Sequence, residues 1–194
     1  VKSKLCEIAD ININKFDEII KEMFEGQRKM VLEKLISKNK KLGLKYIELI
    51  LSKYKKTTER EQEIDFCSQE FVSFFLVQHI KLLCEFNKFD EVLAALKHEE
   101  VIYPFKETLD LCKENKVYDS IIYLYESNGE PTHGIDQCIE RLNINFQEFL
   151  NDIEKSKELN EEKIDEKYVS INRKYINRGM EVCENNSESI EDDI

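Results

Sequence analysis

An all-helical fold is predicted for this chain of 194 residues, and three features of the sequence predict it. The chain contains only five Gly and two Pro residues, so few positions force a turn. Apolar residues recur at intervals of three and four, the spacing of a helix face, rather than alternating as in a strand. One phrase also repeats: Leu83–Phe89 reads LCEFNKF, and Leu111–Val117, 28 residues later, reads LCKENKV. Repeats on this scale predict an α-solenoid of about five stacked antiparallel helical hairpins.

Residues 1–60 are predicted to form basic N-terminal helical hairpins, since they carry fifteen Lys or Arg against nine Asp or Glu. One helix is expected over Ile13–Met23, and two more follow Gly26. The apolar residues of these two are Val31, Leu35 and Ile36, then Ile47, Ile50, Leu51 and Tyr54. The polar run Lys55–Glu63 predicts a long loop. The scattered lysines favour water-exposed helix faces over a binding patch for acidic lipid or an acidic partner.

Residues 61–153 are predicted to form the core of the repeat. Ile64–Phe86 is the most hydrophobic stretch and is apolar on nearly every face, which predicts a helix buried on both sides. Its apolar run is too short to cross a membrane. Shorter helices are expected over Phe89–Leu96, Phe105–Cys112 and Val117–Tyr125, because each carries one apolar stripe.

Two boundaries are predicted in the following stretch. Gly129 ends a helix, because glycine readily adopts the left-handed conformation of a C-terminal cap, and Pro131 begins the next one. Asn145, with Glu148 three residues later, is typical of a variant capping box and predicts that a new helix begins there.

Residues 154–194 are predicted to be an acidic linker followed by an incomplete hairpin. Apolar density falls across Glu154–Glu162 and recovers through Ile164–Tyr175. Val182–Asn185 (VCEN) is a looser echo of the repeated phrase, so a further helix is expected to start there. The chain begins with Val, and we expect it to be a fragment of a longer protein that stops before the packing partners of this last helix.

Charge and cysteine content restrict the class of protein. The net charge is −11, and the 134 residues after residue 60 carry fourteen basic against thirty-one acidic residues, which disfavours nucleic acid as a partner. Six cysteines include no Cys-x-x-Cys pair, so neither a zinc ribbon nor a dithiol redox motif is expected. Cysteines on apolar helix faces favour a reducing compartment such as the cytosol.

Candidate catalytic residues are few. The three histidines, His79, His98 and His133, stand in no local Cys–His signature, and no phosphate-binding glycine motif occurs. Neighbouring cysteines are at least seventeen residues apart, which does not match the spacing of zinc ligands. We therefore predict no catalytic, cofactor-binding or metal-binding residues and no enzymatic activity. The alternative is a small helical enzyme whose cysteine and histidine meet only in space.

The segment Leu83–Phe149, about a third of the chain, resembles the clathrin-heavy-chain repeat of endosomal and vacuolar tethering proteins. The resemblance lies in Phe105–Cys112, Val117–Tyr125, the turn Asn128–Glu130 and the amphipathic Cys138–Leu142. In that family a helix ending in Cys or a similar residue leads to a helix with a Tyr-Leu pair. A turn of Gly and an acidic residue follows, and then a further amphipathic helix.

The resemblance implies a non-enzymatic scaffold segment of a membrane-tethering complex of the CORVET type. Such complexes act in vesicle-mediated protein transport and endosome fusion, so the implied location is cytoplasmic and peripheral on endosomal membranes. The implied partners are the class C core subunits, with Rab GTPases and SNARE machinery reached through the full-length protein. A subunit of the HOPS tether or of a clathrin-type coat is the alternative.

Three tyrosines, Tyr118, Tyr123 and Tyr125, are the candidate partner interface within the best-matched hairpin. Half-exposed tyrosines are enriched at protein interfaces. Tyrosine also commonly lines an amphipathic core, so the alternative is that these rings pack on the neighbouring hairpin.

Overall fold

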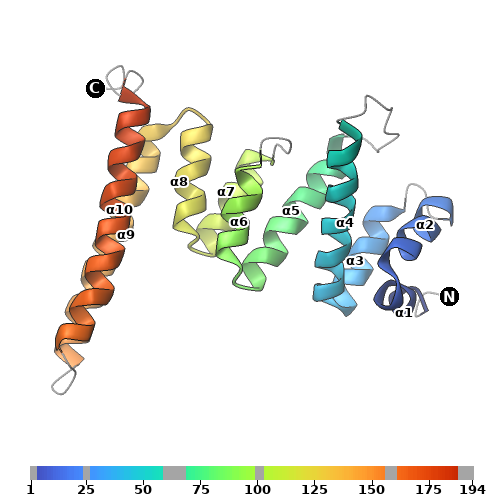
Figure 1. Ribbon diagram of the computed structural model, residues 1–194, viewed down its shortest axis with the longest axis horizontal. Coiled ribbons are helices and arrows are strands. Elements are labelled where there is room, and N and C mark those ends of the chain that lie inside the picture. Colours follow the sequence, from blue (N-terminus) through green and yellow to red (C-terminus); the bar gives the residue numbers. More distant parts are fainter. Residues whose placement is uncertain (1–3, 24–26, 59–68, 99–102, 156–160, 188–194) are drawn as a thin grey trace. The chain divides into compact units, whose positions relative to one another are not determined.

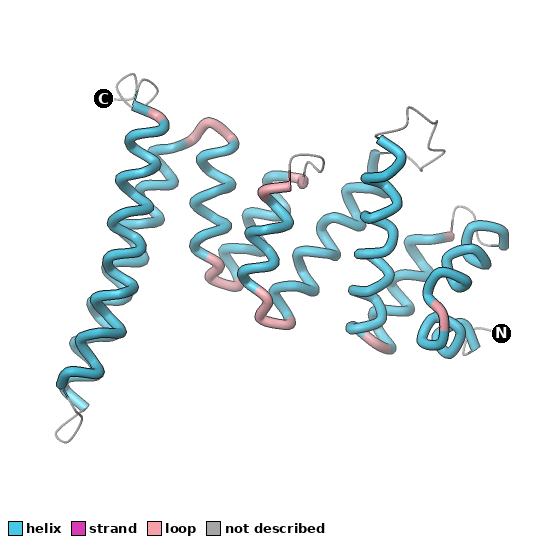
Figure 2. Tube along the Cα trace, viewed as in Figure 1, coloured by secondary structure: helices cyan, strands magenta, loops and turns pink. Residues whose placement is uncertain are grey.

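The computed structural model describes residues 4–23, 27–58, 69–98, 103–155 and 161–187, and the fold is drawn in Figures 1 and 2. Within these ranges the chain forms helices joined by short turns, without a strand. The all-α prediction is therefore confirmed. The chain divides into two compact units, Val1–Leu111 (unit 1) and Cys112–Ile194 (unit 2). The predicted boundaries at residues 60 and 153 stay predictions.

Unit 1 contains six helices among its described residues and most of a seventh, and most of them pack on a neighbouring helix. They are α1 (Lys4–Ile11), α2 (Ile13–Met23), α3 (Arg28–Lys38), α4 (Lys40–Thr58), α5 (Gln69–Glu85), α6 (Phe89–Leu96) and α7 (Phe105–Glu114), whose last turn belongs to unit 2. α1 packs on α2 and α3 on α4; α4 also contacts α2 and α5, and α5 contacts α6. The fully buried side chains of this core include Phe16, Ile20, Leu32, Leu35, Tyr46, Ile47 and Phe75.

A polar cluster inside unit 1 is satisfied by its neighbours. The Tyr46 hydroxyl donates to Oδ1 of the buried Asp17 at 3.1 Å, and Lys53 Nζ donates to Oδ2 at 2.7 Å. The Tyr46 ring also meets Phe16 edge-on, with 5.1 Å between ring centroids. Burial and the Asp17 carboxylate raise the pKa of Tyr46. A buried carboxylate is tolerated here because both of its oxygens are bonded.

The repeated phrase forms a repeated turn. Asn87 and Lys116 each take a left-handed φ of 56°, directly after α5 and α7. The N–H of Lys88 donates to Leu83 O, and the N–H of Val117 to Cys112 O, both at 2.9 Å. These bonds belong to the Schellman motif that closes a helix. The left-handed residues are 29 positions apart, so the turn is displaced by one residue from the 28-residue repeat of the sequence.

Unit 2 is built on three helices: α8 (Tyr118–Ser127), α9 (Pro131–Lys155) and α10 (Glu161–Asn185). α8 packs on α9, and α9 packs along α10 (Figure 1). As predicted, Gly129 takes a left-handed φ of 78° and Pro131 begins a helix. The buried core joins the helices through Ile122, Cys138, Tyr175 and Val182, with Tyr118, Ile135, Leu142 and Ile171 packed around them. α10 runs through the third echo of the phrase and ends at Asn185, so the echo lies at the end of a helix and not at the start of one.

Two predicted boundaries are wrong. α9 continues through Asn145, which is fully buried and points its amide at α10 instead of capping a helix. Nδ2 of Asn145 donates to Asn172 Oδ1 at 2.6 Å and to Tyr168 O at 3.3 Å, which satisfies its buried N–H groups, while its Oδ1 is buried without a hydrogen-bond partner among the described residues. The predicted loop over Lys55–Glu63 is also wrong in its first part. α4 continues to Thr58, because lysine is a good helix former. Residues 59–63 and the predicted helix after residue 187 lie outside the described residues.

Candidate protein-interaction groove

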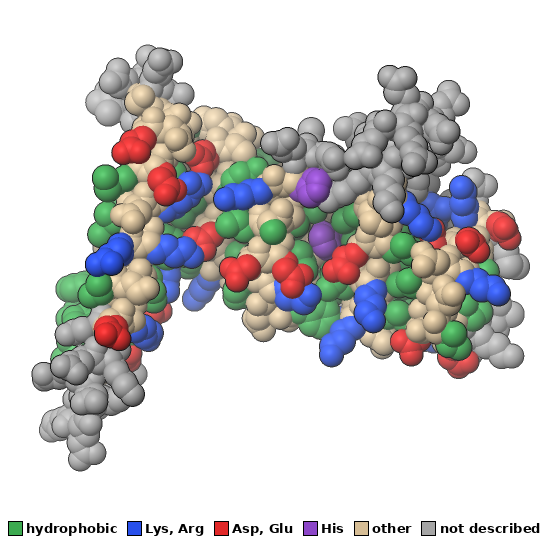
Figure 3. Space-filling model, viewed as in Figure 1, with side chains coloured by type: hydrophobic (Ala, Val, Ile, Leu, Met, Phe, Trp, Pro, Cys, Tyr) green, Lys and Arg blue, Asp and Glu red, His purple; other side chains and the backbone are tan. Residues whose placement is uncertain are grey.

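One face of the hairpin formed by α9 and α10 exposes large hydrophobic side chains along its length. On α9 the stripe consists of Ile135, Ile139, Leu142, Phe146 and Leu150, and on α10 of Val169, Ile176, Met180 and Cys183. The exposed fraction runs from 38% at Leu150 to 56% at Met180 among its large exposed members, whereas Ile135 and Leu142 are partly buried. Figure 3 shows hydrophobic side chains along this edge of the molecule. Contiguous exposed apolar surface of this kind marks interaction sites in soluble proteins.

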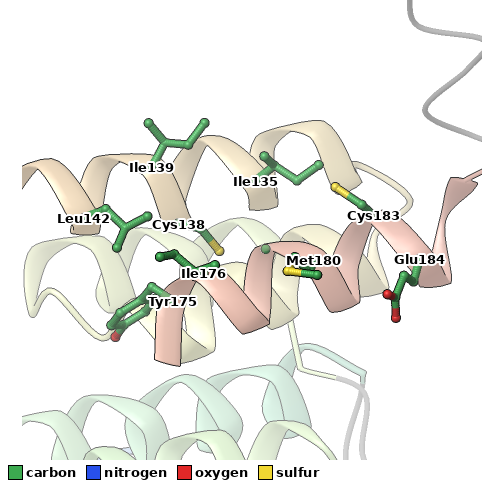
Figure 4. Close-up of a pocket in the computed structure, with 10 residues that line it drawn as sticks. Ile135, Cys138, Ile139, Leu142, Tyr175, Ile176, Met180, Cys183 and Glu184 are labelled. Atoms are coloured by element: carbon green, nitrogen blue, oxygen red, sulfur yellow. The ribbon is translucent and has the colours of Figure 1, made fainter. Parts of the chain in front are cut away.

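An open recess of about 400 Å³ lies between the two stripes, along α9 and α10. Ile135, Ile139 and Leu142 border it from α9, and Ile176 and Met180 border it from α10 (Figure 4). Its lining is almost entirely apolar, with Glu184 at one end. The recess is open, and exposed Phe146, Leu150 and Val169 extend the apolar surface beyond it. We call the recess together with both stripes the α9/α10 groove.

Gly179 and Cys138 form the floor of the groove. A Cβ on Gly179 would lie 3.7 Å from Cys138 Cβ, an ordinary van der Waals distance, so α9 and α10 pack closely here and still leave room for a methyl group. Cys138 is buried, and burial raises the pKa of its thiol to about 11. It therefore stays protonated at neutral pH and behaves as a small apolar residue. Cys183, by contrast, is an exposed free cysteine at the end of the groove.

Charge contacts hold α10 in place against α8, on the side away from the groove. Arg178 donates to Glu126 Oε2 at 2.5 Å, with both side chains about four-fifths buried. Lys174 reaches Asp119 Oδ2 at 2.5 Å. Ion pairs at both ends of α8, together with the Asn145–Asn172 contact, give the groove a fixed backbone. It is therefore a preformed surface.

The rim of the groove is mainly acidic. Exposed Asp136 and Glu154 flank the α9 stripe near its two ends, and exposed Glu166 and Glu184 do the same on α10. Because α9 and α10 are antiparallel, Asp136 shares one end of the groove with Glu184, and Glu154 shares the other with Glu166. Exposed Arg173 lies near the middle of the α10 rim. Among the described rim residues, four carry negative charge and one carries positive charge.

The three predicted interface tyrosines do not share one surface. The Tyr118 ring packs edge-on against the Tyr175 ring, with 6.4 Å between the ring centroids. The Arg141 guanidinium lies over the Tyr118 ring, 5.5 Å from its centroid. Tyr125 is buried, stacks on His133 at 5.3 Å, and accepts a hydrogen bond from Lys113 Nζ at 2.7 Å. Tyr123 is half-buried and lies on a different side of α8. Tyr118 and Tyr125 thus pack within unit 2, and an interface role for the three stays a prediction.

The histidines make local contacts. His79 Nδ1 lies 3.0 Å from the Tyr103 hydroxyl, and the two rings stack in unit 1. His133 Nδ1 lies 3.5 Å from Glu130 Oε2, while exposed His98 follows the end of α6. The described ranges contain no cluster of three or more His, Cys, Asp or Glu placed to hold a metal ion. Separately, none of the described helices is both long enough and apolar enough to span a membrane.

Comparisons with protein-family models, with curated proteins and with solved structures find no match to this chain.

Proposed function

We propose that this chain is a non-enzymatic scaffold segment that binds other proteins within a membrane-tethering complex of the endosomal, CORVET type. The observation that supports the binding role is the α9/α10 groove, an apolar surface on a preformed helical hairpin. The tethering assignment rests on the resemblance of Leu83–Phe149 to the clathrin-heavy-chain repeat. Within that family the segment is most similar to vacuolar protein sorting-associated protein 8, and Arg178–Cys183 would belong to its next helix.

The finer architecture is part of the same proposal. We infer that the helices stack as an α-solenoid, because most consecutive helices within a unit pack on each other, such as α3 on α4 and α8 on α9, and the same Schellman turn recurs after α5 and α7. Small-angle X-ray scattering tests this arrangement. An elongated particle is expected, whereas a radius of gyration near the roughly 16 Å of a compact domain of this length would contradict it.

Binding to purified tethering subunits tests the function. The immobilised chain is expected to retain class C core subunits, and a variant carrying Leu111→Asp and Leu124→Asp is the unfolded control, since Leu124 is buried in α8. Retention of clathrin light chain instead would assign the chain to a coat. Retention of late-endosomal HOPS subunits alone would assign it to that tether. Failure of the folded chain to retain any of these proteins would contradict the proposal.

A further inference from the structure

The shape of the α9/α10 groove fits a helix better than a small ligand or an extended peptide. From Ile135 to Leu150 the α9 stripe covers fifteen residue steps, or about 22 Å at 1.5 Å per step. A compact ligand that filled the recess would leave Phe146, Leu150 and Val169 in water. An extended peptide presents every second side chain to a surface, a period that does not match stripes spaced three and four residues apart.

The spacing of the two stripes is that of a helix-packing seam. On α9, Ile139, Leu142, Phe146 and Leu150 follow at intervals of three and four; on α10, Val169, Ile176, Met180 and Cys183 follow at seven, four and three. Such intervals keep the side chains on one side of each helix. Two neighbouring stripes form holes that receive the apolar side chains of a third helix.

The rim selects the charge of that helix. Asp136 and Glu184 stand at one end, and Glu154 and Glu166 at the other, all exposed. A bound helix would therefore be attracted through Lys or Arg beside its apolar stripe and repelled through Asp or Glu at the same positions. A second copy of this chain that presented the same face would bring acidic rims together, which disfavours self-association there.

On the basis of the proposed function, we propose that the α9/α10 groove binds one amphipathic helix of a partner protein, about 15 residues long, whose apolar stripe is flanked by Lys and Arg. The groove contributes apolar holes for affinity, and its acidic rim contributes selectivity.

Two synthetic peptides test the proposal by fluorescence anisotropy with the full chain. Both have about 15 residues and Leu at the a and d positions, with Lys at the flanking e and g positions in one and Glu in the other. The Lys peptide is expected to bind at least about tenfold more tightly than the Glu peptide at low salt, with a smaller difference at about 1 M salt. Equal affinity for the two peptides, or no binding of the Lys peptide, would overturn the proposal.

Matched variants locate the binding. The double substitution Ile139→Ser and Met180→Ser should lower the affinity for the Lys peptide by about tenfold or more. Both side chains are more than half exposed, so the thermal unfolding curve should be unchanged. Asp136→Lys with Glu184→Lys should remove most of the preference for the Lys peptide. Glu33→Lys with Glu48→Lys, exposed on α3 and α4, makes the same change of charge in unit 1 and should have no effect. If neither groove variant changes the affinity for the Lys peptide, the peptide does not bind in the α9/α10 groove and the proposal is refuted.

Alkylation of Cys183 gives an independent measure of occupancy. Its exposed thiol lines the groove, so the bound Lys peptide should slow its reaction with iodoacetamide. Peptide mass mapping measures the extent of alkylation at Cys183. An unchanged rate at saturating peptide would contradict binding in the groove. A dimer of the free chain that the Ile139→Ser and Met180→Ser variant dissociates would assign the groove to a second copy and overturn the proposal.

The outcomes separate this inference from the proposed function. If the Ile139→Ser and Met180→Ser variant still retains class C core subunits and the wild-type chain does not bind the Lys peptide, the helix assignment fails while the scaffold function stands. If the Lys peptide binds in the groove but no tethering subunit is retained, the tethering function fails while the helix assignment stands.

Discussion

The two units bury their apolar side chains to different degrees. Of the twelve largest fully buried side chains among the described residues, ten belong to unit 1, and the two in unit 2, Ile121 and Ile122, both lie in α8. Of the ten large hydrophobic side chains that are exposed in the described part of the chain, seven lie in α9 and α10. The apolar side chains of unit 1 are therefore mostly buried between its helices, whereas the longest helices of unit 2, α9 and α10, each expose a row of apolar side chains to solvent. Apolar periodicity alone does not distinguish a core face from a binding face.

The largest effect is expected from truncating buried side chains in either unit. Ile47→Ala in unit 1 and Ile122→Ala in unit 2 should each lower the free energy of unfolding by about 2–5 kcal/mol, because both side chains are fully buried. Ile176→Ala, half exposed in the groove, should change it by about 0.5 kcal/mol or less. Urea unfolding measures all three. If Ile176→Ala costs as much as Ile122→Ala, the groove is part of the core and the contrast fails.

Alkaline pH should destabilise both units. Burial raises the pKa of the Cys84 thiol in unit 1 and of the Cys138 thiol in unit 2 from 9.0 to about 11. Above pH 9 the unfolded chain loses these protons first, so stability falls as pH rises towards 11, by about 2 kcal/mol per thiol. Burial also raises the pKa of Tyr175 to about 12, which extends the loss in unit 2.

Thermal unfolding at a series of pH values measures this loss. Cys138→Ala should make the decline between pH 9 and 11 shallower, because one of the shifted groups is removed. A decline that starts only above pH 11 in the wild-type chain would contradict the assignment of the loss to the two thiols.

Alanine at two helical glycines should have opposite effects in the two units. A Cβ at Gly43 would lie 2.6 Å from Ile36 Cγ1 and 3.3 Å from Ile36 Cα, so Gly43→Ala should destabilise unit 1 by about 1–2 kcal/mol. At Gly179 the nearest atom is 3.7 Å away, so Gly179→Ala should stabilise unit 2 by about 0.5–1 kcal/mol through helix propensity. Chemical denaturation compares them. A gain in stability from Gly43→Ala would show that the approach of α3 and α4 is not tight, and a loss from Gly179→Ala would contradict the room for a methyl group between α9 and α10.

The smallest effect is expected at the two Schellman turns. Lys116→Gly should stabilise the chain by up to about 1 kcal/mol, because lysine is strained at a φ of 56°. Asn87→Gly should stabilise the chain by a smaller amount, because asparagine tolerates the left-handed conformation better than lysine does. Differential scanning calorimetry compares the two variants. A larger gain at Asn87 than at Lys116 would indicate that the two turns differ in more than the residue in the left-handed position.

Much of the fold follows from local sequence. α2 matches its predicted bounds, and Gly129 and Pro131 mark a helix end and a helix start through conformational preferences that need no tertiary context. The shift of the second turn to Lys116 was not predictable, because Asn115 is the better left-handed residue. Val117, buried in the structure, directly follows that turn.

The groove was not predictable for a different reason. Ile139 and Ile176 have the spacing of core residues, and only the packing of α9 on α10 shows which side of each stripe meets a neighbour. Asn145 was misassigned as a cap because its partner, Asn172, is 27 residues away on another helix. A signal was present: Leu142 and Phe149 continue one apolar face on either side of Asn145, as expected of an unbroken helix.

The buried Asn145–Asn172 contact has a consequence for what the hairpin can recognise. Sliding α10 along α9 by one turn, about 5.4 Å, would separate the buried Asn145 amide from Asn172, so the contact selects one alignment of the two helices. That alignment also determines which carboxylates face each other across the groove. Replacing Asn145 with leucine would remove the constraint, and the hairpin could then slip into several alignments, each presenting a different pattern of charge. A single interior amide thereby specifies a surface that it does not touch.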